Sequence, residues 1–147
     1  MTTTKTYNIK PINTVKDIDK HFDWMYDWIT PEHCPLKKVS KSLDVELINL
    51  GKYISTDNAI LELDKMGYKP APSNYVLGLG VQHPEAHKEH KYIVSLDKEN
   101  IFAGEDGGPC FLCLGWDDGR RLILASESYD WNDRWWFAVI RKEPLKS

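Results

Sequence analysis

The sequence predicts an α+β fold in which N-terminal helices pack on a C-terminal antiparallel sheet. Before residue 91 the apolar side chains recur mainly at intervals of three and four residues, which is typical of amphipathic helices. From residue 91 onward they alternate with polar residues, as in strands. The chain has 147 residues, which is the length of one domain and enough to bury a core without disulfides or a metal. We therefore expect a single domain, residues 1–147, with a helical extension over 1–43 and an α+β core over 44–142.

The N-terminal extension is expected to contain one long helix. Residues 1–12 precede it and are expected to be extended. Thr14 and Asp17 resemble a capping box, a pair of polar residues that begins many helices. The apolar residues that follow share one helical face: Val15, Ile18, Phe22, Met25 and Ile29. Pro31 predicts the end of this helix.

The core is expected to begin with a strand over residues 45–50, followed by two helices. Ser55 is a good residue to begin a helix, and Gly67 is a good residue to end it. Ser73 is expected to cap the next helix, although Gly78 and Gly80 lower its helix propensity.

The second half of the chain is expected to form an antiparallel meander, with strands over 92–96, 111–114 and 122–124. The Asp118-Gly119 pair between the last two is typical of a hairpin turn. A final strand over 135–140 is apolar on both faces, so we expect it in the middle of the sheet and not at an edge.

Three histidines form the first candidate site. His83, His87 and His90 have the spacing of one helical face, and imidazole nitrogens suit Zn, Ni or Cu. The alternative is a short solvated helix, with no cofactor at all. Cys110 and Cys113 have the spacing of half a zinc ribbon, but strand residues three apart point to opposite faces, so we interpret them as packing residues.

The C-terminal region supplies the second candidate site. Six Trp and seven Tyr make the chain rich in aromatic residues, and Trp and Tyr are enriched at binding hot spots. Loops between the strands are expected to present the ligand-binding residues Trp116, Tyr129, Trp131, Asn132 and Asp133. The amide and carboxylate oxygens suit a cation or a sugar hydroxyl pair, and the alternative is a turn in which they bond the local backbone.

The segment Trp131-Asn132-Asp133, followed closely by an apolar terminal strand, resembles the end of C-type-lectin-like domains. The helix over 58–66 and the stretch 67–72 are similar to a segment of the formylglycine-generating-enzyme and retroelement-variable-protein branches of that fold. The closing stretch 137–142 looks like their arginine-bearing last strand. The resemblance covers roughly residues 45–142 and is closer to small bacterial and phage proteins of this type than to lectins. The lectin disulfide cysteine and Glu-Pro-Asn motif are absent, so the resemblance implies the fold and not sugar binding or catalysis.

Composition narrows the partners. The net charge is -3, with 19 basic and 22 acidic residues, which argues against nucleic acid as the main partner. No apolar run is long enough to span a bilayer. The odd count of three cysteines does not indicate a disulfide framework, so we expect a cytoplasmic protein.

Three functions follow from these observations. The first is a non-catalytic binding protein that recognises a protein partner through loop aromatics, for example a phage or mobile-element protein acting on a host factor. The second is a small metal-dependent enzyme that uses the histidine cluster with Zn. The third is nucleic-acid binding, with Lys37, Lys38 and Lys41 beside the stacking rings of Trp24, Tyr26 and Trp28. Exposed aromatic surface would also permit a homodimer.

Overall fold

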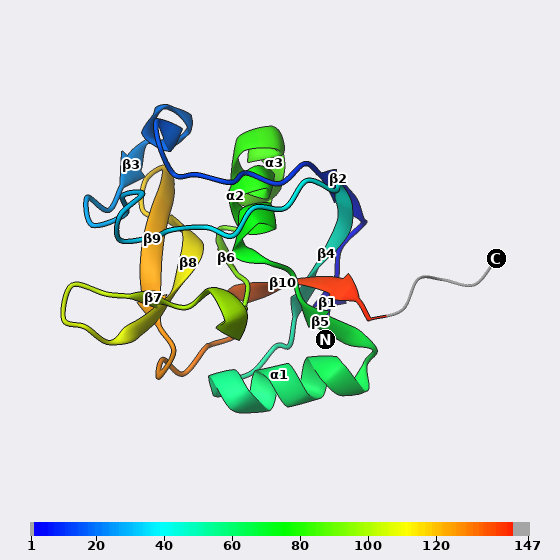
Figure 1. The fold of residues 1–147 in the computed structure, drawn as a ribbon. Coiled ribbons are helices and arrows are strands. Elements are labelled where there is room, and N and C mark those ends of the chain that lie inside the picture. Colours follow the sequence, from blue (N-terminus) through cyan, green and yellow to red (C-terminus); the bar gives the residue numbers. More distant parts are fainter. Residues whose placement is uncertain (1, 143–147) are drawn as a thin grey trace.

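The computed structural model describes residues 2–142, and a ten-stranded mixed sheet forms its centre (Figure 1). The main path through the sheet runs β1 (Thr2–Thr3), β4 (Leu43–Asn49), β10 (Trp135–Arg141), β6 (Tyr92–Val94), β8 (Pro109–Trp116), β9 (Arg120–Ser126) and β3 (Trp24–Met25). Three further strands lie off this path: β2 (Tyr7–Ile9) on β4, β5 (Tyr68–Pro70) on β10, and β7 (Phe102–Ala103) on β8. Most pairs are antiparallel, but β6 is parallel to β10 and β3 is parallel to β9.

The helices of the described part are short. They are α1 (Thr56–Lys65), α2 (Ser73–Gln82), α3 (Pro84–Glu89) and the 3-10 turns η1 (Ile18–His21) and η2 (Lys98–Asn100). Ser55 caps α1 as expected, because its side chain accepts a hydrogen bond from the Asn58 amide. Gly67 follows α1 with φ of 90°, a conformation that favours glycine. The cap of α2 differs from the prediction: Ser73 is the first helical residue, and its amide donates to the carboxylate of Asp97 at 3.1 Å.

The prediction that the last strand lies in the middle of the sheet is confirmed. β10 pairs with β4 on one side and with β5 and β6 on the other. A strand in this position needs apolar side chains on both faces, which the sequence of residues 135–140 provides. The Asp118-Gly119 hairpin between β8 and β9 is confirmed too, with φ of 55° at Asp118 and 146° at Gly119.

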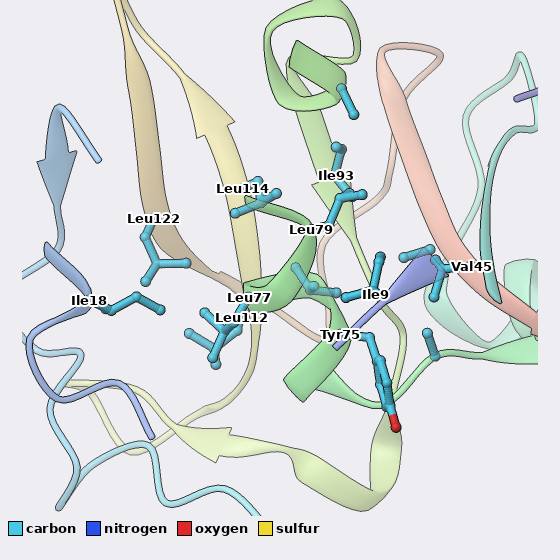
Figure 2. Close-up of a cluster of buried hydrophobic side chains, with 14 of the residues drawn as sticks. Ile9, Ile18, Val45, Tyr75, Leu77, Leu79, Ile93, Leu112, Leu114 and Leu122 are labelled. Carbon is cyan, nitrogen blue, oxygen red and sulfur yellow. The ribbon is translucent and has the colours of Figure 1, made fainter. Parts of the chain in front are cut away.

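Alternating side chains divide the core into two clusters, because successive residues of a strand point to opposite faces. On β8, Leu112 and Leu114 join the cluster around α2, whereas Phe111 and Cys113 join the cluster beneath α1. Figure 2 shows the first cluster, in which Leu77 and Leu79 of α2 lie among side chains from several strands. Each face of the sheet is therefore covered by its own helix.

The N-terminal segment (residues 2–42) lies over α2, and this explains why Ser73–Gly80 are buried all round the helix. The chain passes from β2 across α2 to β3 and returns to β4 (Figure 1). Side chains of α2 hold it in place: Gln82 bonds both the amide and the carbonyl of Lys10. Asn74 donates to Asn13 Oδ1 at 2.9 Å and to the Lys37 carbonyl at 2.8 Å.

The predicted fold class is wrong. The expected arrangement of N-terminal helices packed on a C-terminal antiparallel sheet, of C-type-lectin-like type, is replaced by a mixed sheet with few helices. Within residues 2–43 the helical extension is reduced to the four residues of η1, and the segment contributes β1, β2, β3 and the first residue of β4. Asp17, expected in the first helical turn, has a left-handed backbone with φ of 59°. The buried residues Val15, Ile18 and Ile29 pack into the α2 cluster without forming the expected α-helix, and of these only Ile18 lies in η1.

In residues 2–142 no helix combines the length and the apolar character that crossing a membrane would require.

Candidate binding surface

Trp131, the central residue of the predicted binding loop, is fully buried, with 0% of its surface exposed. An isolated bridge pairs it with Ile54, and each backbone amide donates to the other carbonyl at 2.9 Å. The indole Nε1 donates to Thr56 Oγ1 at 3.0 Å, and that hydroxyl donates to the Glu127 carbonyl at 2.6 Å. The expected exposure of Trp131 is therefore wrong, and its indole joins the start of α1 to the loop over residues 127–131.

Of the three aromatic residues predicted for the binding loops, Tyr129 is the exposed one, with 40% of its surface accessible to solvent. Its ring packs edge-on against Trp131, with centroids 4.9 Å apart. Asn132 Oδ1 accepts from the Arg134 amide at 2.9 Å, which is the local turn that the alternative interpretation predicted. Asp133 is exposed, and its carbonyl accepts from Asn49 Nδ2 at 2.7 Å.

Trp116 lies away from the other four predicted residues. It ends β8, whereas Tyr129 lines a hollow beside Pro109, the first residue of the same strand. The half-buried ring of Trp116 meets the edge of His87, and the Lys91 ammonium lies 5.4 Å from its centroid. The structure thus keeps Tyr129, Asn132 and Asp133 near Trp131 and excludes Trp116 from this surface.

Two residues that the sequence analysis missed complete the surface around Tyr129. Tyr53 is 77% exposed and Leu61 is 56% exposed. Together with Tyr129 they make up three of the four large hydrophobic side chains that are exposed in residues 2–142, the other being Trp24. The exposure of Leu61 could have been predicted from the sequence, because this residue lies outside the buried stripe of Ala59 and Leu63 on an amphipathic helix.

Two adjoining hollows underlie these exposed side chains. The larger, of about 640 Å³, is lined by Tyr53 and Leu61 together with Lys52, Ile54, Ser55, Asn58, Glu62, Lys65 and Asp130. The smaller, of about 400 Å³, is lined by Tyr129 together with Ser55, Thr56, Asp57, Pro109, Glu127 and Ser128. Ser55 lines both, so the hollows meet at the start of α1. We call this region, with its three exposed side chains Tyr53, Leu61 and Tyr129, the Tyr53–Tyr129 face.

Ion pairs compensate part of the charge on this face. Lys98 lies between Asp57 and Glu127, with Nζ 3.3 Å from the Glu127 carboxylate, and the two carboxylates raise the pKa of Lys98. Lys52 pairs with Glu62 at 2.8 Å. Exposed ion pairs of this kind contribute little stability. The smaller hollow stays acidic, because Asp57 and Glu127 share the single cation Lys98. On the wall of the larger hollow, the charges of Lys52 and Glu62 cancel.

The predicted metal ligands do not converge. His83 and His90 flank α3 as its capping residues, outside the six-residue helix. The His83 ring lies near Tyr7, and His90 packs against Trp136. His87 points inward, and its Nε2–H donates to the Gly115 carbonyl, 2.8 Å away. Within residues 2–142 no group of three or more His, Cys, Asp or Glu side chains is arranged to hold a metal ion. The expected three-imidazole site is therefore wrong, because the helix is too short to maintain the spacing.

The two buried cysteines are weak nucleophiles. Cys34 and Cys113 are buried, and all three cysteines are free thiols. Burial raises the pKa of Cys34 to about 11 and that of Cys113 well above its usual value. Such thiols stay protonated and unreactive at neutral pH.

The aromatic residues of the nucleic-acid hypothesis are largely occupied by contacts within the chain. Trp28 stacks on His33 with ring centroids 3.6 Å apart. The Tyr26 hydroxyl donates to Glu105 at 2.8 Å, so a carboxylate lies beside this ring. Trp24 is exposed, but the Arg121 guanidinium lies 4.7 Å from its centroid. Lys37, Lys38 and Lys41 are exposed, and nucleic-acid binding through them stays a prediction.

No family model, curated protein or solved structure matches this chain. Its functional interpretation therefore depends on the Tyr53–Tyr129 face itself.

Proposed function

We propose that this chain is a non-catalytic binding protein that recognises a protein partner through the Tyr53–Tyr129 face. The observation that carries the proposal is the gathering of Tyr53, Leu61 and Tyr129 on one face beside two hollows. Tyrosine provides a large contact area at a small cost in conformational entropy, which makes it an effective anchor residue. Tyr129 belongs both to the site predicted from the sequence and to this face. Tyr53 and Leu61 take the place of Trp131 and Trp116 as the other contact residues.

The scaffold beneath the face supports this role. Trp131 and Thr56 are buried and hydrogen-bonded to each other, so they hold the start of α1 and the 127–131 loop together. A surface that is preformed in this way loses little conformational freedom when a partner binds. The free, unreactive thiols fit a reducing compartment, and we propose the cytoplasm as the place of action.

A random-peptide display selection against the immobilised wild-type protein tests the proposal. We expect enriched peptides whose affinity falls at least tenfold for Tyr53→Ala and for Tyr129→Ala, which corresponds to the loss of a moderate hot spot. Trp24→Ala is the matched control, because it removes an exposed aromatic residue from a different part of the surface. We expect this control to bind the same peptides with unchanged affinity.

Two outcomes would overturn the proposal. One is a selection that enriches no peptide, or only peptides whose binding survives both tyrosine substitutions. The other is a stable dimer in light scattering that becomes monomeric in the Tyr53→Ala variant, because the face would then be an interface between two copies of this chain.

A further inference from the structure

The larger hollow of the Tyr53–Tyr129 face is a groove along the exposed side of α1. Four residues of α1 line this groove, and they share one face of the helix because they are three, four and seven residues from the first of them. They are Asn58, Leu61, Glu62 and Lys65. The segment 52–55 and Asp130 form the opposite side. The groove therefore has a direction, from the first turn of α1 to its last residue.

The two ends of the groove carry opposite charges. Asp130 lies at the first end, because the Ile54–Trp131 bridge places Asp130 across from Ser55, the cap of α1. Lys65 is the last residue of α1 and marks the other end. Asp130 and Lys65 are exposed, and neither takes part in an ion pair among residues 2–142. The Lys52–Glu62 pair lies on the lining between them and is internally compensated.

One aromatic residue, Tyr53, lines the groove together with Asp130. Tyr129, which precedes Asp130 in the chain, lines the smaller hollow instead. The Asp130 carboxylate favours a cationic group of the partner, because the two can form a charge-assisted hydrogen bond. Between the ends, Tyr53, Ile54 and Leu61 supply the apolar part of the lining.

We propose that this groove binds an extended peptide segment of the partner that has a basic side chain for Asp130, an apolar side chain for Tyr53 and Leu61, and an acidic side chain for Lys65. Asp130 lies across from Ser55, and Ser55 and Lys65 are separated by about 15 Å along the helix axis at about 1.5 Å per residue. An extended peptide covers that length in about four to five residues. The basic and acidic side chains are therefore about four to five residues apart, with the apolar one between them. This inference rests on the proposed function and adds the chemistry of the partner to it.

The peptides from the display selection, remade as fluorescent synthetic peptides, test this inference by polarisation. We expect the enriched sequences to share Arg or Lys about four to five positions from Asp or Glu, with an apolar residue between them. Asp130→Asn should weaken binding about tenfold and reduce its salt dependence, because it removes one charge pair. Asp133→Asn is the control, because Asp133 is exposed nearby but lines neither hollow. The affinity of this variant for the peptides should stay within about twofold of wild type.

A charge exchange sharpens the test. Asp130→Lys should abolish binding of the wild-type peptide and restore it for a peptide whose basic residue is replaced by Glu. If the enriched peptides bind through Tyr53 and Tyr129 but carry no such charge pattern, or are indifferent to Asp130→Asn, the inference fails while the proposed function stands. If no peptide depends on the two tyrosines, both fail.

Discussion

Individual residues show how a polar neighbourhood can mislead sequence reasoning. Trp131 stands beside Asn132 and Asp133, a pattern typical of a surface turn, and those two neighbours do lie at or near the surface. The bridge to Ile54 nevertheless turns the indole into the core, where it packs edge-on against Trp135 with centroids 4.8 Å apart. A buried indole needs a partner for its N–H group, and Thr56 provides one.

The Thr56 hydroxyl is therefore expected to matter for stability. Thr56→Val keeps the shape of the side chain but leaves the buried Trp131 N–H without an acceptor, so the free energy of unfolding should fall by about 1–3 kcal/mol. Thr56→Ser keeps the hydroxyl and is the matched control, with a smaller loss. Urea denaturation of the three proteins measures the difference. Equal stability of the Val and Ser variants would show that the hydrogen bond contributes nothing.

At the scale of elements, local signals predicted the central part of the chain well and the N-terminal segment poorly. The strand at 45–50, the helix from Ser55 and the final strand are present close to their expected bounds. The helix expected from Thr14 is absent, although its apolar spacing was helical. Packing on α2 buries Val15 and Ile18 although only η1 is helical in this segment. Gln82 of α2 bonds the Lys10 backbone directly. Asn74 of α2 donates to the Asn13 side chain, which in turn accepts from the Val39 amide. Tertiary contacts of this kind override helix propensity.

The two glycines of α2 differ in how closely the N-terminal segment packs against them. A Cβ atom at Gly78 would lie 2.5 Å from both Ile9 Cγ2 and the Lys10 carbonyl oxygen, which is backbone. At Gly80 the nearest atoms belong to the side chains of Phe22 and Leu114, at 3.0 and 3.1 Å, and these can shift. Glycine is thus required where the segment crosses the helix.

We expect Gly78→Ala to lower the free energy of unfolding by about 1–3 kcal/mol despite its better helix propensity. Gly80→Ala is the graded comparison and should cost less. Thermal or urea denaturation gives the ranking, and hydrogen exchange at residues 9–13 reports whether the segment loosens. If Gly80→Ala lowers the free energy of unfolding more than Gly78→Ala does, the N-terminal segment does not pack closely against Gly78.

At the scale of the whole molecule, stability should depend on pH through a buried histidine. His87 is fully buried between α3 and β8, and its Nε2 lies 2.8 Å from the Gly115 carbonyl oxygen. Burial lowers the pKa of His87 to about 4 from 6.5, against the opposing effect of the Gly115 hydrogen bond. Because the unfolded chain binds the proton more readily, the native state is favoured above pH 6.5 and loses this advantage as the pH falls toward 4.

The expected loss from this group is about 2 kcal/mol between pH 7 and pH 5. Urea denaturation of wild type and His87→Gln at both values measures it, and the variant should lose less stability on acidification than wild type. An identical loss in the two proteins would place the acid sensitivity in other groups. The comparison uses the change with pH, so a general destabilisation by the substitution does not affect it.

The sequence alone determined which segments form the central elements, because periodicity, caps and turn residues act over a few neighbours. Ser55, Gly67 and the Asp118-Gly119 turn each specify their element locally. The sequence also predicted that residues 135–140 are central, since only an interior strand buries both faces. Tertiary structure decided the rest: the parallel pairing of β10 with β6, the path of residues 2–42 over α2, and the burial of Trp131. Those features depend on contacts between residues far apart in the chain, such as Trp131 with Ile54 and Thr56. For the same reason Tyr53, Leu61 and Tyr129 become one surface only when the chain has folded.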